Sequence, residues 1–339
     1  MKCSLIILKK PAVKTLLLCL LLAAPWPAVS APPALKFRYI TSEDGLSNST
    51  IECIFQDSEG FMWFGTRDGL NKYDGYQMTV YKNNPKDDSS ISDNYIRCIY
   101  EDKQKNLWIG TTNGLNRFNK TTGTFTRFKH SGSTYSLSNN HVNCIYEDSR
   151  NNFWISTYGG GLNRYDKKSG RFYPYRNKDS DKESLNDDFV NCVFEDSRKN
   201  LWIGTESGLN RFNPQNESFQ EYPVSNKKKI NIRLIREDAD GGIWLGSEAQ
   251  GLFKIDHKTN RINHFFYKEK DFSSIGSDMI RDILRDKNGN IWVGCINGGL
   301  NLLNRGGNSF YHYTDDSSQP GSLSQRTVSA LFEDNQGNL

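Results

Sequence analysis

A unit of about 45 residues repeats along this chain and limits the possible folds more than any other feature of the sequence. Its marker is a tryptophan, with an aspartate six residues before it and a Gly-Leu pair six or seven residues after it. A period of this size excludes leucine-rich repeats, which run at about 20–29 residues, and the shorter rungs of a β-helix. The six marker residues are Trp63, Trp108, Trp154, Trp202, Trp244 and Trp292.

Each unit contains four short runs of β-branched and aromatic residues, separated by Gly, Asn, Asp and Ser. In the third unit the runs begin at Val142, Phe153, Leu162 and Arg171. This composition predicts strands, and Asn-Gly or Gly-Gly dipeptides between the first two runs suit a hairpin. Four antiparallel strands in each unit predict an all-β fold, a β-propeller with one four-stranded blade per unit.

The first strand of each unit is apolar on both faces. Simple alternation places Val142, Cys144 and Tyr146 on one face and Ile145 on the other, as expected for a strand packed between two neighbouring blades. We therefore interpret the repeated tryptophans as core residues between blades. We interpret the repeated aspartates as caps of the hairpin turn, through side-chain to backbone hydrogen bonds.

The two ends of the chain predict seven blades. Residues 36–39 resemble the fourth strand of a unit, and residues 328–334 resemble the first strand of a seventh. We expect the two termini to share the last blade, which would hide the exposed sheet edges. Because Asn338-Leu339 aligns with the residues just before Trp108, the seventh blade should be incomplete and the chain a fragment of a longer protein.

The first 31 residues predict an export signal. A basic stretch ends at Lys14, an apolar run extends from Leu16 to Ala24, and small residues surround Ser30. Nine apolar residues are too few to span a bilayer, which takes about 20, so a cleaved signal peptide over residues 1–31 is favoured over an uncleaved membrane anchor. Residues 32–339 then form the propeller domain, which we expect in the periplasm.

The net charge of +4 comes from the four lysines of the predicted signal peptide. The rest of the chain holds 39 basic and 39 acidic residues. A neutral remainder without a basic cluster argues against nucleic acid as a partner.

Neither a metal site nor a catalytic site is expected. The aspartates lack the spacing of a calcium loop, and the histidines lack that of zinc ligands. No nucleophile elbow or phosphate-binding glycine loop appears, so no cofactor is predicted. The cysteines share one register of the first strand and should point the same way around the ring, which favours small buried hydrophobic residues over disulfides. They are Cys53, Cys98, Cys144 and Cys192, with Cys295 outside that register.

The loop between the second and third strands changes from unit to unit, and such loops on a rigid ring often bind ligands. Its mixture of acid, amide, arginine and tyrosine would suit a polyhydroxylated ligand or a partner domain. Ordinary solvent-exposed turns are an equally good interpretation of any single residue. The candidate ligand-binding residues are Arg67, Asp68, Asn113, Tyr158, Glu206, Glu248 and Asn297.

Several phrases of the unit resemble the two-component regulator propeller repeat. They include Cys-Ile-Tyr-Glu-Asp, Asn-Leu-Trp-Ile-Gly-Thr and Gly-Leu-Asn-Arg-Phe-Asn, with Ser-Leu-Ser-Asn-Asn between units at 136–140. The resemblance covers residues 36–339. It departs at Ser156, where other copies carry glycine, and in the shortened connection around residues 227–230.

The resemblance implies a periplasmic sensor region of a hybrid two-component histidine kinase, of the kind common in Bacteroidetes. Such sensors respond to oligosaccharides derived from glycans, and the kinase that performs catalysis would lie outside this sequence. The implied partners are an oligosaccharide ligand, the remaining propeller and immunoglobulin-like domains of the parent protein, and a second copy in a homodimer; the parent protein would be anchored in the inner membrane. The alternatives are a secreted propeller enzyme, such as a lyase or glycosidase, and an assembly scaffold.

Overall fold

The computed structural model describes residues 35, 37–225, 229–316, 318 and 322–339. The predicted signal peptide (residues 1–31) and residues 226–228 of the shortened connection lie outside these ranges. Residues Lys36–Leu339 form one compact unit. In the described part of the chain the one helix is a short 3-10 turn, Ser42–Asp44, and no helix is long and apolar enough to cross a membrane.

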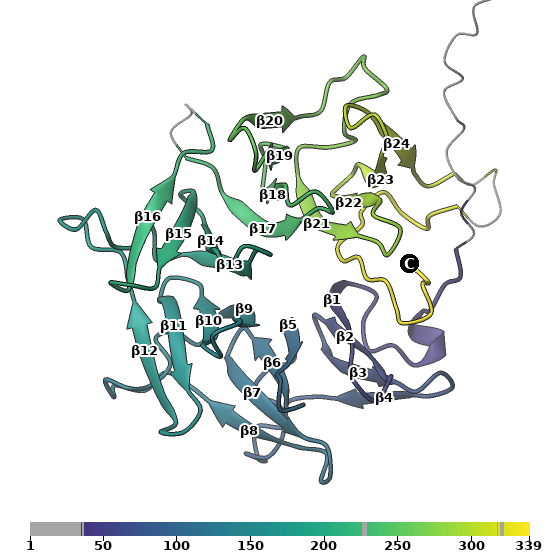
Figure 1. Cartoon of the computed structure of the whole chain (residues 1–339). Helices are drawn as coiled ribbons and strands as arrows, with labels where there is room; N and C mark the ends of the chain where they lie inside the picture. Colours follow the sequence, from purple (N-terminus) through teal and green to yellow (C-terminus); the bar gives the residue numbers. More distant parts are fainter. Residues whose placement is uncertain (1–34, 36, 226–228, 317, 319–321) are drawn as a thin grey trace, which may run out of the picture. The chain divides into compact units, whose positions relative to one another are not determined.

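The strands form six four-stranded antiparallel sheets, each with its strands in sequence order (Figure 1). We number the sheets as blades 1 to 6. Blade 1 contains β1 (Ile51–Gln56), β2 (Met62–Thr66), β3 (Gly69–Tyr73) and β4 (Met78–Tyr81). Blade 2 contains β5 (Ile96–Glu101), β6 (Leu107–Thr111), β7 (Gly114–Asn119) and β8 (Thr124–Phe128). Blade 3 contains β9 (Val142–Glu147), β10 (Phe153–Thr157), β11 (Gly161–Asp166) and β12 (Arg171–Tyr175).

The other three blades repeat this pattern. Blade 4 contains β13 (Val190–Glu195), β14 (Leu201–Thr205), β15 (Leu209–Asn213) and β16 (Ser218–Tyr222). Blade 5 contains β17 (Ile232–Glu237), β18 (Ile243–Ser247), β19 (Leu252–Ile255) and β20 (Ile262–Phe265). Blade 6 contains β21 (Ile280–Arg285), β22 (Ile291–Cys295), β23 (Gly299–Leu303) and β24 (Phe310–Tyr313).

The first strand of every blade lies nearest the centre of the ring (Figure 1). Each packs against the first strand of the next blade, in the order β1, β5, β9, β13, β17 and β21. The predicted all-β propeller with four antiparallel strands per blade is therefore confirmed.

The predicted number of blades is wrong: the described chain forms six, not seven with an incomplete last one. Neither residues 37–39 nor residues 328–334 form a strand. The reason is physical, because a strand is stabilised by a ladder of hydrogen bonds to a neighbour. Within the described residues neither segment has such a ladder.

Residues 328–339 nevertheless pack between blades 6 and 1 (yellow in Figure 1). The backbone N–H of Leu331 donates to Asp282 of β21 at 2.9 Å. On the other side, the backbone N–H of Asn335 donates to Gln56 of β1 at 2.8 Å. With one backbone bond from Val328 to the Cys295 carbonyl, the segment therefore links the first and last blades through single hydrogen bonds rather than through a sheet.

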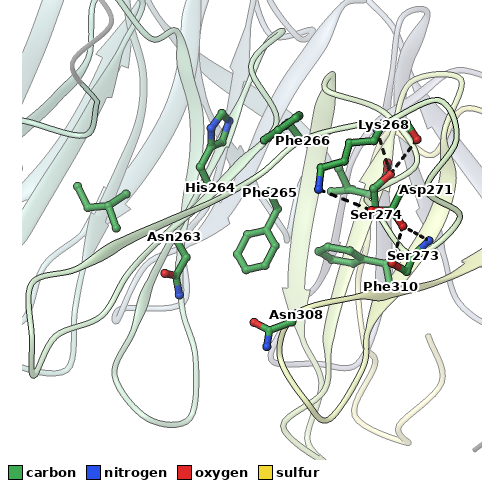
Figure 2. A pocket seen from close by; sticks show the side chains of 12 residues that line it. Asn263, His264, Phe265, Phe266, Lys268, Asp271, Ser273, Ser274, Asn308 and Phe310 are labelled. Atoms are coloured by element: carbon green, nitrogen blue, oxygen red, sulfur yellow. Dashed lines mark hydrogen bonds and ion pairs between the residues drawn. The ribbon is translucent and has the colours of Figure 1, made fainter. Parts of the chain in front are cut away.

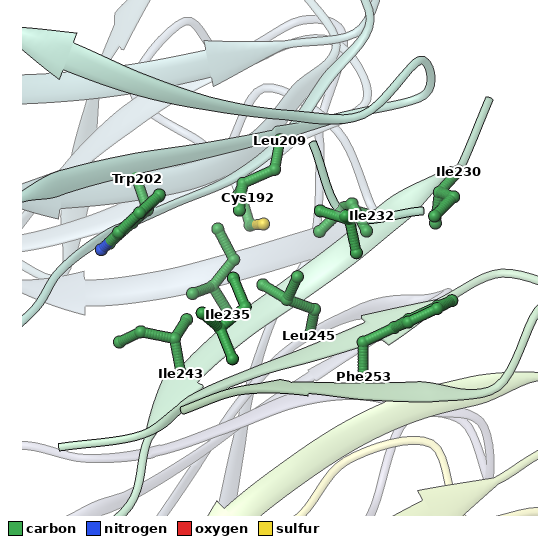
Figure 3. Close-up of a cluster of buried hydrophobic side chains, with 11 residues drawn as sticks. Cys192, Trp202, Leu209, Ile230, Ile232, Ile235, Ile243, Leu245 and Phe253 are labelled. Carbon is green, nitrogen blue, oxygen red and sulfur yellow. The ribbon is translucent and has the colours of Figure 1, made fainter. Parts of the chain in front are cut away.

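Neighbouring blades are held together by apolar clusters, as the interface of blades 4 and 5 illustrates. Figure 3 shows Trp202 and Cys192 of blade 4 against Ile232 and Ile235 of blade 5. A Cβ placed on Gly204 would lie 2.6 Å from the Cys192 sulfur and 2.8 Å from Ile232. This crowding explains the recurring glycine of the second strand, which only blade 3 replaces, with Ser156, since a larger residue overpacks the interface between the blades.

The five described cysteines are all free, as predicted from their register. They pack in the interfaces between blades, with Cys192 and Cys295 inside the apolar clusters and Cys53 and Cys98 against them. Burial raises the pKa of Cys53 and Cys295 to about 12. These thiols therefore stay protonated at neutral pH and behave as small apolar side chains.

The repeated aspartates cap the hairpin turns, as predicted. In blade 3, one carboxylate oxygen of Asp148 accepts from the backbone N–H of Arg150 and Asn152, at 3.0 and 2.8 Å. The other oxygen accepts from the indole N–H of Trp154 at 2.9 Å. This second bond was not predicted, and it recurs at 2.8–2.9 Å in all six blades.

Candidate functional site: the central rim

A β-bulge interrupts the ladder between the first and second strands of every blade. In blade 3, Val142 pairs with Thr157 and Cys144 pairs with Ser156, so Asn143 between them has no partner. The predicted alternation is therefore wrong here. Val142 shares a face with Ile145, because a bulge adds one residue and shifts everything beyond it to the other face.

The bulged residue belongs to neither packed face of its blade. All six of these side chains are half-buried and polar or charged, and they lie at one end of the innermost strands. They are Glu52, Arg97, Asn143, Asn191, Arg233 and Arg281. We call this set, with the loop residues that contact it, the central rim.

On blades 1 to 3 the rim is organised around Glu52. Its carboxylate accepts from Arg67 at 2.7 Å, from the Tyr95 hydroxyl at 3.0 Å and from Arg97 at 3.5 Å. Burial opposes ionisation, but the bonds from Arg67 and Tyr95 outweigh it and hold the pKa of Glu52 below its usual value. Arg97 also reaches Asn143 of the next blade at 3.4 Å.

On blades 5 and 6 the rim is organised around Glu248. Its carboxylate pairs with Arg233 at 2.8 Å and with Arg281 at 3.7 Å. Burial and the charge of Arg233 lower the pKa of Arg281, while Glu248 and Glu52 act in the opposite direction. Since charges on blades 1, 5 and 6 all act on one guanidinium, these side chains converge on a common region.

Aromatic rings form the part of the rim on blades 2 to 4. The Tyr158 ring lies 5.2 Å from the ring of His141 and 4.6 Å from that of Phe189. Tyr158 remains 40% exposed, so one surface of its ring is available for contact. Burial, and then the charge of Arg97, lower the pKa of His141, which makes this imidazole neutral at pH 7.

The structure separates the candidate loop residues into two groups. Arg67, Tyr158 and Glu248 contact the bulged residues or the aromatic rings of the rim. Glu206 occupies the equivalent loop position in blade 4, where its backbone N–H donates to the Phe189 carbonyl, but no described contact joins its side chain to the bulged residues. Their role in binding stays a prediction.

The second group lies one position further along the same loops. Asp68 turns away from the bulged residues and pairs with Lys82 at 2.6 Å. Asn113 and Asn297 occupy the equivalent loop position and are exposed. The structure does not bring this group into contact with the bulged residues, and its role in binding also stays a prediction.

Two groups of rim residues were missed by sequence reasoning. One is the six bulged residues, and the other is the residues just before the first strand, such as Tyr95, His141 and Phe189. A sequence signal exists for the bulged residues. The position after the first apolar residue of that strand changes from Glu to Arg to Asn, while its two neighbours stay apolar in every blade but the sixth, where Asp282 follows Arg281.

Several hollows lie elsewhere on the blades, among them two that are lined by aromatic residues and lysine. One of about 370 Å³ lies between blades 5 and 6, next to the outermost strands β20 and β24 (Figure 2). There His264 stacks on Phe253 with a ring distance of 4.2 Å, and Lys268 pairs with Asp271 at 3.6 Å.

The second hollow, of about 730 Å³, lies between blades 2 and 3 and is lined by Trp108, Tyr165 and Lys167. Lys167 is already paired there with Asp102 and Glu147, at 2.9 and 3.0 Å. Among the residues with described positions, no three His, Cys, Asp or Glu side chains gather as metal ligands would.

Comparison with known proteins identifies the repeat. Five segments match the family described as two component regulator propeller: residues 45–68, 90–113, 136–159, 184–207 and 274–297. Each segment runs from the turn before the first strand to the loop after the second, and so contains the bulged residue, the aspartate and the tryptophan. Five of the six repeats, all but that of blade 5, therefore match the two component regulator propeller.

Solved structures extend the comparison to the whole propeller. The extracellular domain of BT3049, a putative hybrid two component system of B. thetaiotaomicron, is 27% identical with a TM-score of 0.75. The match covers 88% of this chain and 39% of that one. The extracellular domain of BT4673 from the same organism is 22% identical with a TM-score of 0.70, over 87% of this chain and 37% of that one, which shows the fold alone.

One further relative is a full-length sequence. "Histidine kinase P4" of Formosa agariphila is 53% identical over 55 residues, or 16% of this chain and 4% of that protein. This chain is therefore similar to part of the extracellular domain of a putative hybrid two component system, and it spans about two-fifths of the BT3049 domain.

The fold also occurs in an enzyme. A streptogramin B lyase is 14% identical with a TM-score of 0.62, and the match covers 86% of this chain and 90% of the lyase. At this identity the likeness shows the propeller fold and nothing of the lyase's activity.

Proposed function

We propose that this chain is a ligand-sensing propeller in the periplasmic part of a hybrid two-component histidine kinase, and that its ligand is an oligosaccharide derived from a glycan. The observation that carries the proposal is the central rim. Polar side chains from six separate blades lie there, held by salt bridges on blades 1, 2, 5 and 6 and by hydrogen bonds of Asn143 and Asn191 on blades 3 and 4. A rigid ring that displays varied polar side chains is suited to recognition.

The electrostatics of the rim favour binding over acid–base catalysis. A general acid at neutral pH needs a carboxyl group whose pKa is raised. Glu52 has a lowered pKa because Arg67 and Tyr95 bond to its ionised form. It is therefore suited to hold Arg67 and Arg97 in place rather than to exchange a proton with a substrate.

The remaining parts of the proposal come from the relatives. We infer export by residues 1–31 and an inner-membrane anchor elsewhere in the parent protein, because the similar structures are extracellular domains of two-component systems. The partners proposed are the further propeller and immunoglobulin-like domains of that parent, and a second copy of it.

The proposal is tested by thermal unfolding of the chain in the presence of a panel of glycan oligosaccharides. A ligand at 100 times its Kd stabilises the folded chain by about 2.7 kcal/mol, which is a measurable rise in Tm. The Tyr158→Ala variant should lose the rise, whereas Tyr76→Ala, which removes an exposed tyrosine from the turn between β3 and β4, should keep it.

The same incubations distinguish the alternative functions. If mass spectrometry detected shortened sugars, the chain would be a secreted lyase or glycosidase rather than a sensor. An unchanged Tm across the panel would instead favour a scaffold.

A further inference from the structure

The charges of the central rim are unequal in sign. The rim holds four guanidinium groups and two carboxylates: Arg67, Arg97, Arg233, Arg281, Glu52 and Glu248. Two positive charges are left without a partner of opposite sign in this set. In a half-buried setting such an excess is costly, and an incoming anion would relieve it.

One excess positive charge lies on blades 1 and 2, and the other lies on blades 5 and 6. Glu248 alone serves both Arg233 and Arg281, and its contact with Arg281 is long, at 3.7 Å. A guanidinium has five N–H donors in a planar fork, so one carboxylate cannot satisfy two of them. Arg233 and Arg281 therefore present unused donors on the same side of the rim.

A similar deficit occurs at Arg97. Its Nε is buried without a hydrogen-bond partner, and its terminal nitrogens make only long contacts, at 3.4 Å to Asn143 and 3.5 Å to Glu52. Leaving a buried donor unpaired destabilises a protein unless a ligand or water supplies the acceptor.

The other charges nearby do not neutralise Arg233 and Arg281. Arg236 and Asp282 pair with each other at 3.2 Å and add no net charge. Asp93 keeps its negative charge, but it bonds to the Thr112 hydroxyl at 2.7 Å and acts on His141, on blades 2 and 3. Among the described ion pairs, none joins Glu206 of blade 4 to either arginine.

We propose that the central rim selects an acidic oligosaccharide, with Arg233 and Arg281 binding a carboxylate or sulfate group of the sugar. The exposed ring of Tyr158, backed by His141 and Phe189, would contact the apolar face of a sugar ring, as aromatic side chains do in ligand sites. This assignment rests on the proposed sensing function and names the class of ligand.

The test is calorimetric titration of the chain with matched pairs of sugars. One pair is oligogalacturonides and their methyl esters, and the other is sulfated galactan oligosaccharides and their desulfated forms. In at least one pair the charged member should bind about tenfold more tightly than the neutral member. The pair that responds distinguishes carboxylate from sulfate, and added salt should weaken that binding.

Variants then locate the effect. Arg233→Gln and Arg281→Gln should each weaken binding of the charged sugar about tenfold, whereas Glu248→Gln, which releases both arginines, should strengthen it. Arg211→Gln is the matched control, because it removes the same charge from the exposed side of β15. Thermal unfolding of each variant shows that the fold is retained.

The outcomes separate this inference from the proposed function. If neutral sugars bind as tightly as charged ones and Tyr158→Ala abolishes their binding, the sensing function stands and the acidic ligand is refuted. The acidic ligand is likewise refuted if Arg233→Gln and Arg281→Gln act no more strongly than Arg211→Gln. Absence of binding to every sugar overturns both proposals.

Discussion

Asp148 performs two tasks with one carboxylate. It orders the hairpin turn between β9 and β10 and accepts the indole N–H of Trp154, which is fully buried between blades 3 and 4. A local turn and a long-range interface are thus connected through one side chain. The constant six-residue spacing follows from this, since one carboxylate must reach both the turn residues that follow it and the indole ring beyond them.

Asp148→Ala should lower the free energy of unfolding by about 2–4 kcal/mol, because it leaves the buried Trp154 N–H and the turn without an acceptor. The measurement is urea unfolding followed by tryptophan fluorescence. Asp179→Ala, an exposed aspartate in the connection between blades 3 and 4, is the control and should change stability by less than about 0.5 kcal/mol. Equal losses for the two variants would show that the Asp148 bonds contribute nothing.

At the scale of strands, the residue of the second strand that pairs with the cysteine is glycine in blade 2 and serine in blade 3. Cys98 faces Gly110 in blade 2, and Cys144 faces Ser156 in blade 3. A Cβ on Gly110 would lie 2.5 Å from the Cys98 sulfur and 2.7 Å from Val142. Ser156 is fully buried, and its hydroxyl has no hydrogen-bond partner.

Replacement by alanine should therefore have opposite effects at these two positions. Gly110→Ala should destabilise the chain by about 1–3 kcal/mol through overpacking. Ser156→Ala should stabilise it by about 1 kcal/mol, because it removes a buried and unpaired hydroxyl. Urea unfolding of both variants measures this, and a shift of the same sign in both would contradict the packing argument.

Strands and turns could be predicted because their cues are local. Alternating apolar residues around Ile145 and the glycines of the hairpins act within a few residues of themselves. The bulge at Asn143 could not be predicted in this way, since an extra residue in one strand is defined only by its register with the other. For that reason the loop residue Arg67 was found from the sequence, while its partner Glu52 was missed.

At the scale of the whole molecule, local resemblance was a poor guide to the number of blades. Residues 328–334 have the composition of a first strand, and residues 37–39 that of a fourth. Composition expresses a preference, but a strand forms only when a partner completes the ladder. Six units had such partners and formed blades, whereas residues 328–339 packed through Asp282 and Gln56.

Stability should depend on pH in two steps. Burial opposes ionisation of Asp102 and Asp238, but bonds from tryptophan and lysine outweigh it, so their pKa values are lowered. A carboxyl whose pKa is lower in the folded state stabilises the protein above its unfolded pKa of about 3.9, and this contribution is lost as the pH falls through the folded pKa. For the histidines His141 and His312, burial itself lowers the pKa, because it disfavours the charged imidazole. The loss of stability caused by these histidines begins below about pH 6.5, where the imidazole of the unfolded chain takes up a proton and that of the folded chain does not.

The free energy of unfolding should therefore decline from about pH 6.5 and decline again below about pH 4. Burial raises the pKa of Asp282, so this residue makes the decline in the free energy of unfolding below about pH 4 smaller. Urea unfolding at a series of pH values gives the curve, and His141→Asn should reduce the upper step while leaving the lower one. A curve that is flat from about pH 7 to about pH 4.5 would refute the assignment of the histidines.

The bulge in each innermost strand also affects how such a ring can evolve. The aspartate, the tryptophan and the glycine are each fixed by a neighbour, so replacing any of them costs stability. Asn143 and its five counterparts have no ladder partner and no place in the core, and mutation can therefore sample them one at a time. Descendants of one propeller can thus diverge in what they recognise through single changes at these bulged positions, while inheriting the same scaffold.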